Sequence, residues 1–207
     1  MRIAAQDPQA VVAFLTTDHY ISDSAKFVAQ IRAALDIAVK QRGRVVLLGL
    51  EPESPEVVYG WIEPARAIHG EAKVFGLRRF WEKPNRMFAQ LFFRRCCLWN
   101  SFVMVASAQA LLNVVASAIP YLYCSFTALT PLFGTTAETK AIAALYSRLA
   151  EINLSHQILT LKTEKLAVLK VSDIRWNDHG EPQRVMASLE MAGVRPQWAE
   201  KRLPQFA

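Results

Sequence analysis

Residues 11–18, with the sequence Val11-Val12-Ala13-Phe14-Leu15-Thr16-Thr17-Asp18, decide the fold class that we expect for this chain. The first five residues, 11–15, are an uninterrupted apolar run, which is typical of a strand that is buried on both faces in a parallel sheet. A second such run, residues 45–50, comes after a predicted helix. Strand, helix and strand in this order predict a right-handed parallel crossover and an α/β sheet. Ligands bind beyond the carboxyl ends of such strands, and Asp18 stands at one of these ends.

The helix between these two strands has a start signal and a stop signal. Ser22 or Asp23 can cap its beginning, and Gly43 can close it. Its apolar residues fall on one face: Phe27, Ile31, Ala34, Leu35 and Ala38. Similar patterns predict strands at 57–62, 73–81, 98–105 and 166–171, and helices at 86–95, 108–118, 137–151 and after Pro182. Since the 207 residues contain no repeat or linker, we expect one domain over 1–207.

The charge of the chain allows two interpretations. Lys and Arg number 24 against 18 Asp and Glu, a net charge of +6, and clustered basic residues would suit a nucleic acid. Adjacent basic pairs such as Arg78-Arg79 and Arg94-Arg95 are few, however, and basic residues are not interleaved with aromatic ones. We therefore expect no nucleic-acid partner, and the small positive surplus suits an enzyme with phosphorylated substrates.

Residues 102–126 are mostly apolar and long enough to cross a bilayer as a helix. Polar or helix-breaking residues interrupt the stretch at Gln109, Asn113 and Pro120. Its first residues are β-branched enough for a strand, so we expect a buried strand followed by core helices and no membrane partner. The cysteines lack metal-binding spacing, and reduced thiols together with the absence of a secretory signal at residues 1–8 predict a cytoplasmic protein.

Asp18 and Asp178 are candidates for a metal site. Each follows a predicted strand, and two carboxylates from distant strand ends can meet on one Mg²⁺, which prefers carboxylate and phosphate oxygens. Such an ion would offset negative charge in a phosphoryl or nucleotidyl transfer. The alternative is that each aspartate is a turn residue or a helix cap. Asp178 lies in the segment Trp176-Asn177-Asp178-His179-Gly180.

Glu82-Lys83-Pro84 and Asn100 are candidates for binding a sugar phosphate. Proline stiffens the chain after Lys83, Glu can accept two sugar hydroxyls, and Lys presents a point charge to a phosphate. Asn100, beside Trp99 in apolar surroundings, needs partners that a sugar hydroxyl can supply, although a satisfied core amide is the alternative. Gly60, in a predicted strand, marks either a bulge or a close approach of a ligand to the backbone.

These segments together resemble the mannose-1-phosphate guanylyltransferases in order and spacing. The resemblance covers residues 7–198 and is carried by Asp18-His19, Tyr59-Gly60-Trp61-Ile62-Glu63, Glu82-Lys83-Pro84, Leu98-Trp99-Asn100-Ser101 and the segment ending at Gly180. It implies a Rossmann-like, three-layer α/β/α domain of the nucleotide-diphospho-sugar transferase type with a mostly parallel sheet. The implied reaction joins mannose 1-phosphate and GTP to give GDP-mannose and pyrophosphate.

The resemblance also implies roles for individual residues. Asp18 and Asp178 match the metal-binding aspartates of the family, with Mg²⁺ as the cofactor, and these two together with Lys83 would be catalytic. The substrate-binding residues would be Tyr59, Gly60, Glu82, Lys83 and Asn100. Gly60 matches a glycine whose backbone meets the sugar, Glu82 a carboxylate on sugar hydroxyls, Lys83 a lysine on the sugar phosphate, and Asn100 an asparagine near the sugar ring.

Two features depart from the family pattern. Phe102 stands where the family usually has glycine after Trp-Asn-Ser, which would reshape the sugar pocket. The family also opens with a strand and a Gly-rich loop that hold the nucleotide triphosphate, and no phosphate-cradling glycine cluster is found among the 8 glycines of this chain. We therefore expect an N-terminally truncated domain whose exposed strand edges favour a homo-oligomer or a partner that supplies a strand.

Three functions remain open at this point. The first is a sugar-phosphate nucleotidyltransferase, poorly active or inactive as this chain alone. The second is a non-catalytic sugar-phosphate-binding or regulatory paralogue of such an enzyme. The third is a membrane-attached protein that uses residues 102–126.

Overall fold

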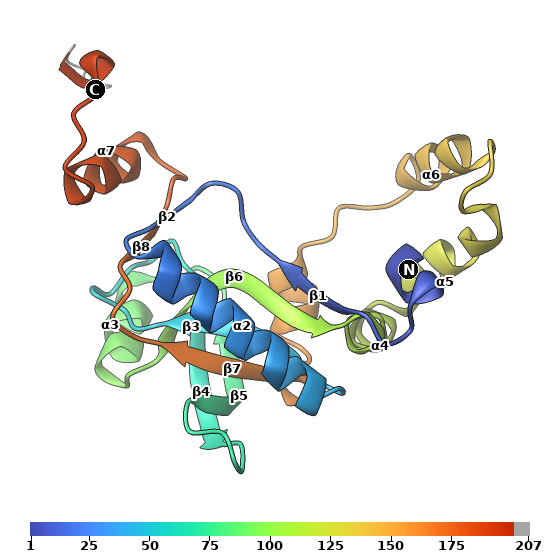
Figure 1. Ribbon diagram of the computed structural model, residues 1–207, viewed down its shortest axis with the longest axis horizontal. Helices are drawn as coiled ribbons and strands as arrows, with labels where there is room; N and C mark the ends of the chain where they lie inside the picture. The colour runs from blue at the N-terminus through green and yellow to red at the C-terminus, as the bar shows by residue number, and fades with distance from the viewer. Residues whose placement is uncertain (201–207) are drawn as a thin grey trace.

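The computed structural model describes residues 1–200, so the end of the expected domain, residues 201–207, lies outside the described residues (Figure 1). The strands are β1 Val11–Phe14, β2 His19–Ile21, β3 Val45–Leu50, β4 Trp61–Ala67, β5 Val74–Trp81, β6 Leu98–Ser107, β7 Leu166–Val171 and β8 Trp176–Asp178. The α-helices are α1 Arg2–Gln6, α2 Ser24–Lys40, α3 Arg86–Arg94, α4 Ala108–Ala118, α5 Pro120–Thr127, α6 Glu138–Tyr146 and α7 Pro182–Met191. A π-helix, η2, covers Ser155–Leu159, and short 3₁₀ turns cover Thr130–Leu132, Thr163–Lys165 and Gln197–Glu200.

The main sheet is mixed and closes on itself, which corrects the predicted parallel sheet. Its strand order is β1-β6-β3-β7-β5-β4, and an additional pairing of β4 with β6 joins the strands β6, β3, β7, β5 and β4 into a closed ring. In the part of the chain that the structure describes, only the pairing of β3 with β7 is parallel, and the others in this sheet are antiparallel. The expected Rossmann-like three-layer α/β/α domain with a mostly parallel sheet is therefore wrong for this chain.

Strand β1 accounts for much of this error. We predicted a buried parallel strand at residues 11–15, but β1 lies at the edge of the sheet, pairs antiparallel with β6, and leaves Phe14 45% exposed. The order of strand, helix and strand does bring β1 and β3 into the same direction, since both are antiparallel to β6. Because β6 lies between them, the two strands do not form a parallel pair. An apolar run predicts a strand but does not identify its neighbour.

Strand β3 and helix α2 match the prediction in position and burial. Each residue of β3 is buried, with Val46 and Leu48 in a core on one face and Val45 and Leu47 in a core on the other. Two packed faces explain why the strand is apolar without alternation. The carboxylate of Asp23 accepts a hydrogen bond from the Lys26 backbone N–H at 2.9 Å, as expected of a helix cap. Figure 1 shows α2 lying along one face of the strands.

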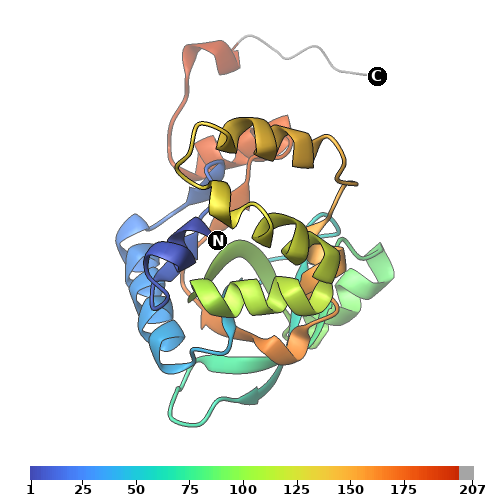
Figure 2. The same ribbon diagram turned by 90° about the vertical axis from the view of Figure 1, so that its right-hand side faces the viewer.

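Other elements are placed as predicted with shifted ends. Strand β4 begins at Trp61, so Gly60 comes directly before the strand and not within it. The predicted helix at 137–151 is the shorter α6, and α5 fills part of the apolar stretch after α4. Figure 2 shows α4, α5 and α6 together on the side of the molecule that carries the N-terminus. Among residues 1–200, every helix is too short or too polar to reach across a bilayer.

A small second sheet positions the candidate site. Strands β2 and β8 pair antiparallel, with His19 opposite Asp178 and Ile21 opposite Trp176. The pairing continues beyond the strands, because the His179 backbone N–H donates to the Asp18 carbonyl at 3.1 Å. Two segments that are far apart in the sequence are thereby joined at one end of the main sheet.

Candidate functional site

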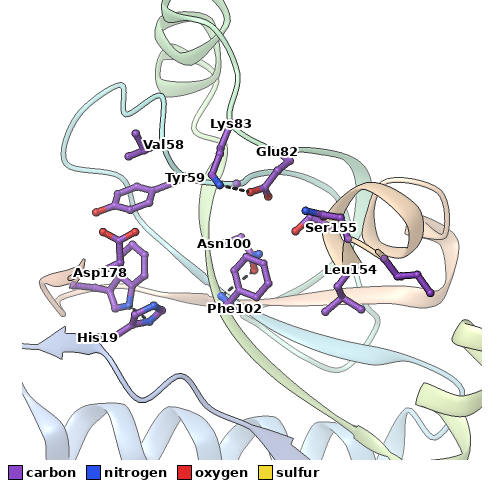
Figure 3. Close-up of a pocket in the computed structure, with 14 residues that line it drawn as sticks. His19, Val58, Tyr59, Glu82, Lys83, Asn100, Phe102, Leu154, Ser155 and Asp178 are labelled. Carbon is purple, nitrogen blue, oxygen red and sulfur yellow. Dashed lines mark hydrogen bonds and ion pairs between the residues drawn. The ribbon is translucent and has the colours of Figure 1, made fainter. Parts of the chain in front are cut away.

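A cavity of about 340 Å³ lies where the second sheet meets the ends of the main strands (Figure 3). Its volume is at the lower end of the ~300–1,000 Å³ usual for ligand sites. It is lined by Tyr59, Gly60, Glu82, Lys83, Asn100 and Asp178, which are six of the predicted site residues. Asp18 is the predicted residue that is not among the lining residues. These six residues come from four separate parts of the sequence.

Asn100 and Glu82, which both line the cavity, each carry a buried polar atom without a hydrogen-bond partner among the described residues. Asn100 is 2% exposed, and its Oδ1 accepts the Phe102 backbone N–H at 3.2 Å, whereas its Nδ2 has no hydrogen-bond partner among the described residues. Glu82 Oε2 is also buried without a partner in that part of the chain. A buried polar atom without a partner costs about 1–3 kcal/mol. A ligand that hydrogen-bonds to both atoms removes this cost for each of them. One is a donor and the other an acceptor, as a sugar hydroxyl requires.

Gly60 lies against both of these side chains. Its carbonyl accepts the Asn100 backbone N–H at 2.8 Å. A Cβ at this position would stand 3.1 Å from Glu82 Oε2 and 3.3 Å from Asn100 Cβ, tighter than ordinary packing. A residue without a side chain is thus needed for the backbone to approach Glu82 and Asn100 this closely.

Lys83 contributes the positive charge of the cavity. Its Nζ lies 3.7 Å from Glu82 Oε1, and its side chain is 66% exposed. Its backbone has a φ of 46°, the left-handed region that residues other than glycine seldom adopt. The Lys83 ammonium group is carried on a flexible side chain and contacts one oxygen of Glu82. It can therefore turn toward a bound phosphate while the backbone stays in place.

Asp178 is held by Arg184 from helix α7. The guanidinium Nη1 donates to Asp178 Oδ1 at 3.0 Å, and Nη2 donates to Glu56 Oε2 at 3.3 Å. The same group contacts the Tyr59 hydroxyl and lies over the Tyr59 ring, 4.5 Å from its centroid. The Tyr59 hydroxyl donates in turn to Asn177 Oδ1 at 3.1 Å. Burial, together with the nearby charge of Asp178, raises the pKa of Tyr59 to about 12, so the phenol stays protonated at neutral pH.

The backbones of Asp18 and Asp178 lie side by side at the end of the second sheet, but their side chains have different environments. The β2–β8 pairing places Asp178 opposite His19, and the Asp18 side chain is 71% exposed. Within residues 1–200 no cluster of three or more His, Cys, Asp or Glu side chains has the geometry of a metal site. Whether the two carboxylates hold a metal together remains a prediction.

His19 has a defined tautomer on the wall of the cavity. The indole Nε1–H of Trp176 can only donate, and it lies 3.1 Å from His19 Nδ1, which must therefore accept. The hydroxyl of Thr16 lies 2.6 Å from the same nitrogen. Burial lowers the pKa of His19, although the carboxylates of Asp18 and Asp178 act in the opposite direction. His19 is therefore neutral near pH 7, with its proton on Nε2.

Some residues of the site gave no usable signal in the sequence. Residues 152–155 form one wall of the cavity, but they lie in a loop and the start of a π-helix without a recognisable motif. Arg184 is one of many scattered basic residues, and Glu56 lies in a predicted loop. Phe102 is marked in the sequence only by its departure from the family pattern. Trp176 and His19 belong to motifs of the sequence, but residue spacing does not indicate that they line the same cavity.

Comparisons with known proteins identify distant relatives of this chain. No protein-family model matches the chain. It is 29% identical over 196 residues to mannose-1-phosphate guanylyltransferase 2 of Escherichia coli O157:H7, which covers 86% of this chain and 37% of that protein. It is 36% identical over 88 residues to mannose-1-phosphate guanylyltransferase of Escherichia coli K12, covering 42% of this chain and 18% of that one. This chain thus spans little more than a third of the length of these relatives at most.

Two solved structures share the fold. One, described as mannose-1-phosphate geranyltransferase from Thermus thermophilus, superposes with a TM-score of 0.76 at 24% identity over 90% of this chain and 51% of its own. The other, mannose-6-phosphate isomerase from Helicobacter pylori, has a TM-score of 0.65 at 20% identity over 83% of this chain and 65% of its own.

The chain is thus similar in sequence to enzymes that handle sugar phosphates, and similar in fold to the two solved structures. More narrowly, it is a distant homologue of the mannose-1-phosphate guanylyltransferases.

Proposed function

We propose that this chain binds a sugar 1-phosphate in the cavity around Asn100, as the sugar-binding part of a nucleotidyltransferase of the mannose-1-phosphate guanylyltransferase type. The observation that carries the proposal is the pair of unpaired buried atoms, Asn100 Nδ2 and Glu82 Oε2, at one cavity. A hydroxyl-rich ligand satisfies a donor and an acceptor together, whereas an apolar ligand would leave both unpaired.

Each residue has a defined task in the proposed complex. Glu82 accepts hydrogen bonds from sugar hydroxyls, and Asn100 donates one to a ring substituent. Gly60 leaves room for the sugar, and Lys83 moves its ammonium group from Glu82 to the phosphate. In the reaction, a phosphate oxygen of mannose 1-phosphate forms a bond to the α-phosphorus of GTP, and the bond from that phosphorus to pyrophosphate breaks. These residues would hold the attacking phosphate in place, since positioning and charge stabilisation dominate such transfers.

Asp18 and Asp178 would hold Mg²⁺ in this scheme. Their donor chemistry fits, because Mg²⁺ is commonly bound by one or two carboxylates together with substrate phosphates, and the β2–β8 pairing joins their backbones. When bound, the ion would offset the negative charge of the phosphates. Arg184 contacts Asp178 through Oδ1, so the other carboxylate oxygen, Oδ2, would be the one to bind the ion.

A second candidate function is binding of the sugar phosphate without catalysis. It is favoured by the contact of Arg184 with Asp178, which already balances the charge of that carboxylate, and by the outward position of Asp18. In this case the chain would be a sugar-phosphate-binding or regulatory relative of the transferases. The two candidates share the cavity and differ in turnover.

Calorimetric titration of mannose 1-phosphate into the full chain tests the shared part. We expect saturable binding that is weakened at least tenfold in Glu82→Gln and Asn100→Asp, which is about 1.4 kcal/mol or more. Glu53→Gln is the matched control, since its side chain is 59% exposed and lies outside this cavity. Absence of binding to the folded wild-type chain would reject both candidates.

Formation of GDP-mannose from GTP, mannose 1-phosphate and Mg²⁺ separates them. Turnover that is lost in Asp178→Asn supports the transferase. Binding of mannose 1-phosphate without turnover supports the second candidate.

A further inference from the structure

Strand β6 has an irregularity directly beside Asn100. Along its pairing with β3, Leu47 is opposite Met104 and Gly49 is opposite Asn100, so residues 101–103 face the single residue Leu48. The hydroxyl of Ser101 fixes this bulge by donating to the Leu48 carbonyl at 2.7 Å. Bulges turn a side chain away from the alternation of the strand and are common next to active sites.

The residue that the bulge redirects is Phe102. Its φ of 61° lies in the left-handed region, which costs a residue with a Cβ about 1–2 kcal/mol. Four residues other than glycine have such a φ in the described chain, and two of them, Lys83 and Phe102, line the cavity. Strained backbone of this kind is often found at ligand-binding sites.

The Phe102 side chain lines the cavity. In the view of Figure 3 its ring lies between His19 and Asp178 on one side and Leu154 and Ser155 on the other. Its backbone N–H holds Asn100 Oδ1 at 3.2 Å, which leaves Nδ2 of the same amide free for a ligand. An aromatic ring thus lines the same cavity as the residue that carries the unpaired donor.

We propose that Phe102 is a specificity-determining residue that limits the cavity to sugar phosphates whose ring carries only hydroxyl groups near Asn100. This inference rests on the proposed function and narrows its substrate class. In this proposal a hydroxyl is small enough to be accepted beside the phenyl ring. A bulkier group such as an N-acetyl substituent would need volume that the ring fills, in a cavity whose volume of about 340 Å³ is already at the lower end of the usual range. The ring also has no atom that could hydrogen-bond the acetamide.

The test compares two ligands that differ in one substituent, mannose 1-phosphate and its 2-acetamido-2-deoxy analogue. The ratio of their dissociation constants is measured by calorimetry in the wild-type chain, in Phe102→Gly and in Phe102→Asn. Both variants remove the ring, and both residues tolerate a left-handed backbone. We expect the preference for mannose 1-phosphate to fall at least tenfold in each.

Cys96→Gly is the matched control for the backbone, because Cys96 also has a positive φ, of 54°, but lies outside the cavity. Its ligand preference should equal that of the wild type. An unchanged ratio in the folded Phe102 variants, with mannose 1-phosphate still bound, overturns the role of Phe102 and leaves the proposed function standing. Absence of binding of both ligands to the wild type overturns both.

Discussion

Gly60 lies so close to Glu82 that a Cβ on its backbone would stand 3.1 Å from the carboxylate Oε2. The same Cβ would stand 3.0 Å from Phe80 Cζ, so the added methyl group cannot simply turn away from the carboxylate. The backbone of one residue therefore fixes the position of a side chain that we assign to the sugar.

Gly60→Ala should displace the Glu82 carboxylate by a few tenths of an ångström and weaken binding of mannose 1-phosphate about tenfold, or ~1.4 kcal/mol. Gly43→Ala is the control, because a Cβ there meets nothing within 4 Å. Calorimetric titration of both variants measures the effect. Equal affinities in the two variants would show that Gly60 does not position Glu82 for a ligand.

His19 should make the stability of the protein depend on pH. Its pKa is lowered in the folded state from the ordinary value of 6.5, chiefly by burial. Between the folded pKa and about 6.5, the unfolded chain binds more protons than the folded one, so stability falls as the pH drops through this window. Protonation of Nδ1 would also remove the acceptor that Trp176 uses.

His19→Asn should reduce this fall, because asparagine does not titrate and its Oδ1 can accept the same indole N–H. Urea unfolding midpoints at pH 5, 6, 7 and 8 provide the measurement. The exposed His69 serves as the comparison, and His69→Asn should retain the wild-type slope. A slope that survives in His19→Asn would assign the pH dependence to other groups.

Replacing Cys96 by glycine should stabilise the protein. Helix α3 ends with the Cys97 N–H bonded to the Phe92 carbonyl at 3.0 Å and the Cys96 N–H bonded to the Phe93 carbonyl at 3.2 Å, the two hydrogen bonds of a Schellman motif. Cys96 stands in the left-handed position that glycine prefers. Cys96→Gly should raise the free energy of unfolding by about 1 kcal/mol, as measured with urea. Cys96→Ser removes the thiol but keeps the Cβ, so a similar gain there would refute the backbone explanation.

Arg184 should anchor helix α7 to the cavity. Its side chain is 14% exposed and bridges Glu56 and Asp178, so Arg184→Ala leaves two carboxylates without their shared donor. We expect a loss of about 1–2 kcal/mol in the free energy of unfolding, compared with almost none for the exposed Arg148→Ala. Limited proteolysis should cut near residues 182–191 sooner in Arg184→Ala. Unchanged proteolysis and stability would indicate that α7 is held by its apolar contacts alone.

The sequence predicted elements of the fold better than their arrangement. The apolar runs at β3 and β7 and the capped helix α2 depend on neighbouring residues, which is why local patterns located them. Strand pairing depends on residues far apart in the chain. The ten-residue β6 takes the place between β1 and β3 and also meets β4, and no pattern in β1 indicates this.

Motifs located most of the predicted residues that line the cavity, among them Gly60, Glu82 and Asn100, and Asn100 stands out as a polar residue in apolar surroundings. The predicted metal pair, Asp18 and Asp178, stays a prediction. Strand pairing brings the two backbones together. The contact of Asp178 with Arg184 could not be predicted, because Arg184 belongs to no motif. The wall at residues 152–155 depends on a loop path that residue spacing does not encode. Strain at Phe102 likewise becomes visible only in the backbone angles.

The most direct measurement concerns the side-chain amide of Asn100. Its two Nδ2 protons give a pair of signals in a ¹H–¹⁵N correlation spectrum, which Asn100→Asp identifies by their loss. If the cavity binds a sugar phosphate through this amide, mannose 1-phosphate should move both signals in a saturable way, and mannitol at equal concentration should not. Signals of Asn100 that stay in place while mannose 1-phosphate shifts resonances elsewhere would contradict the account.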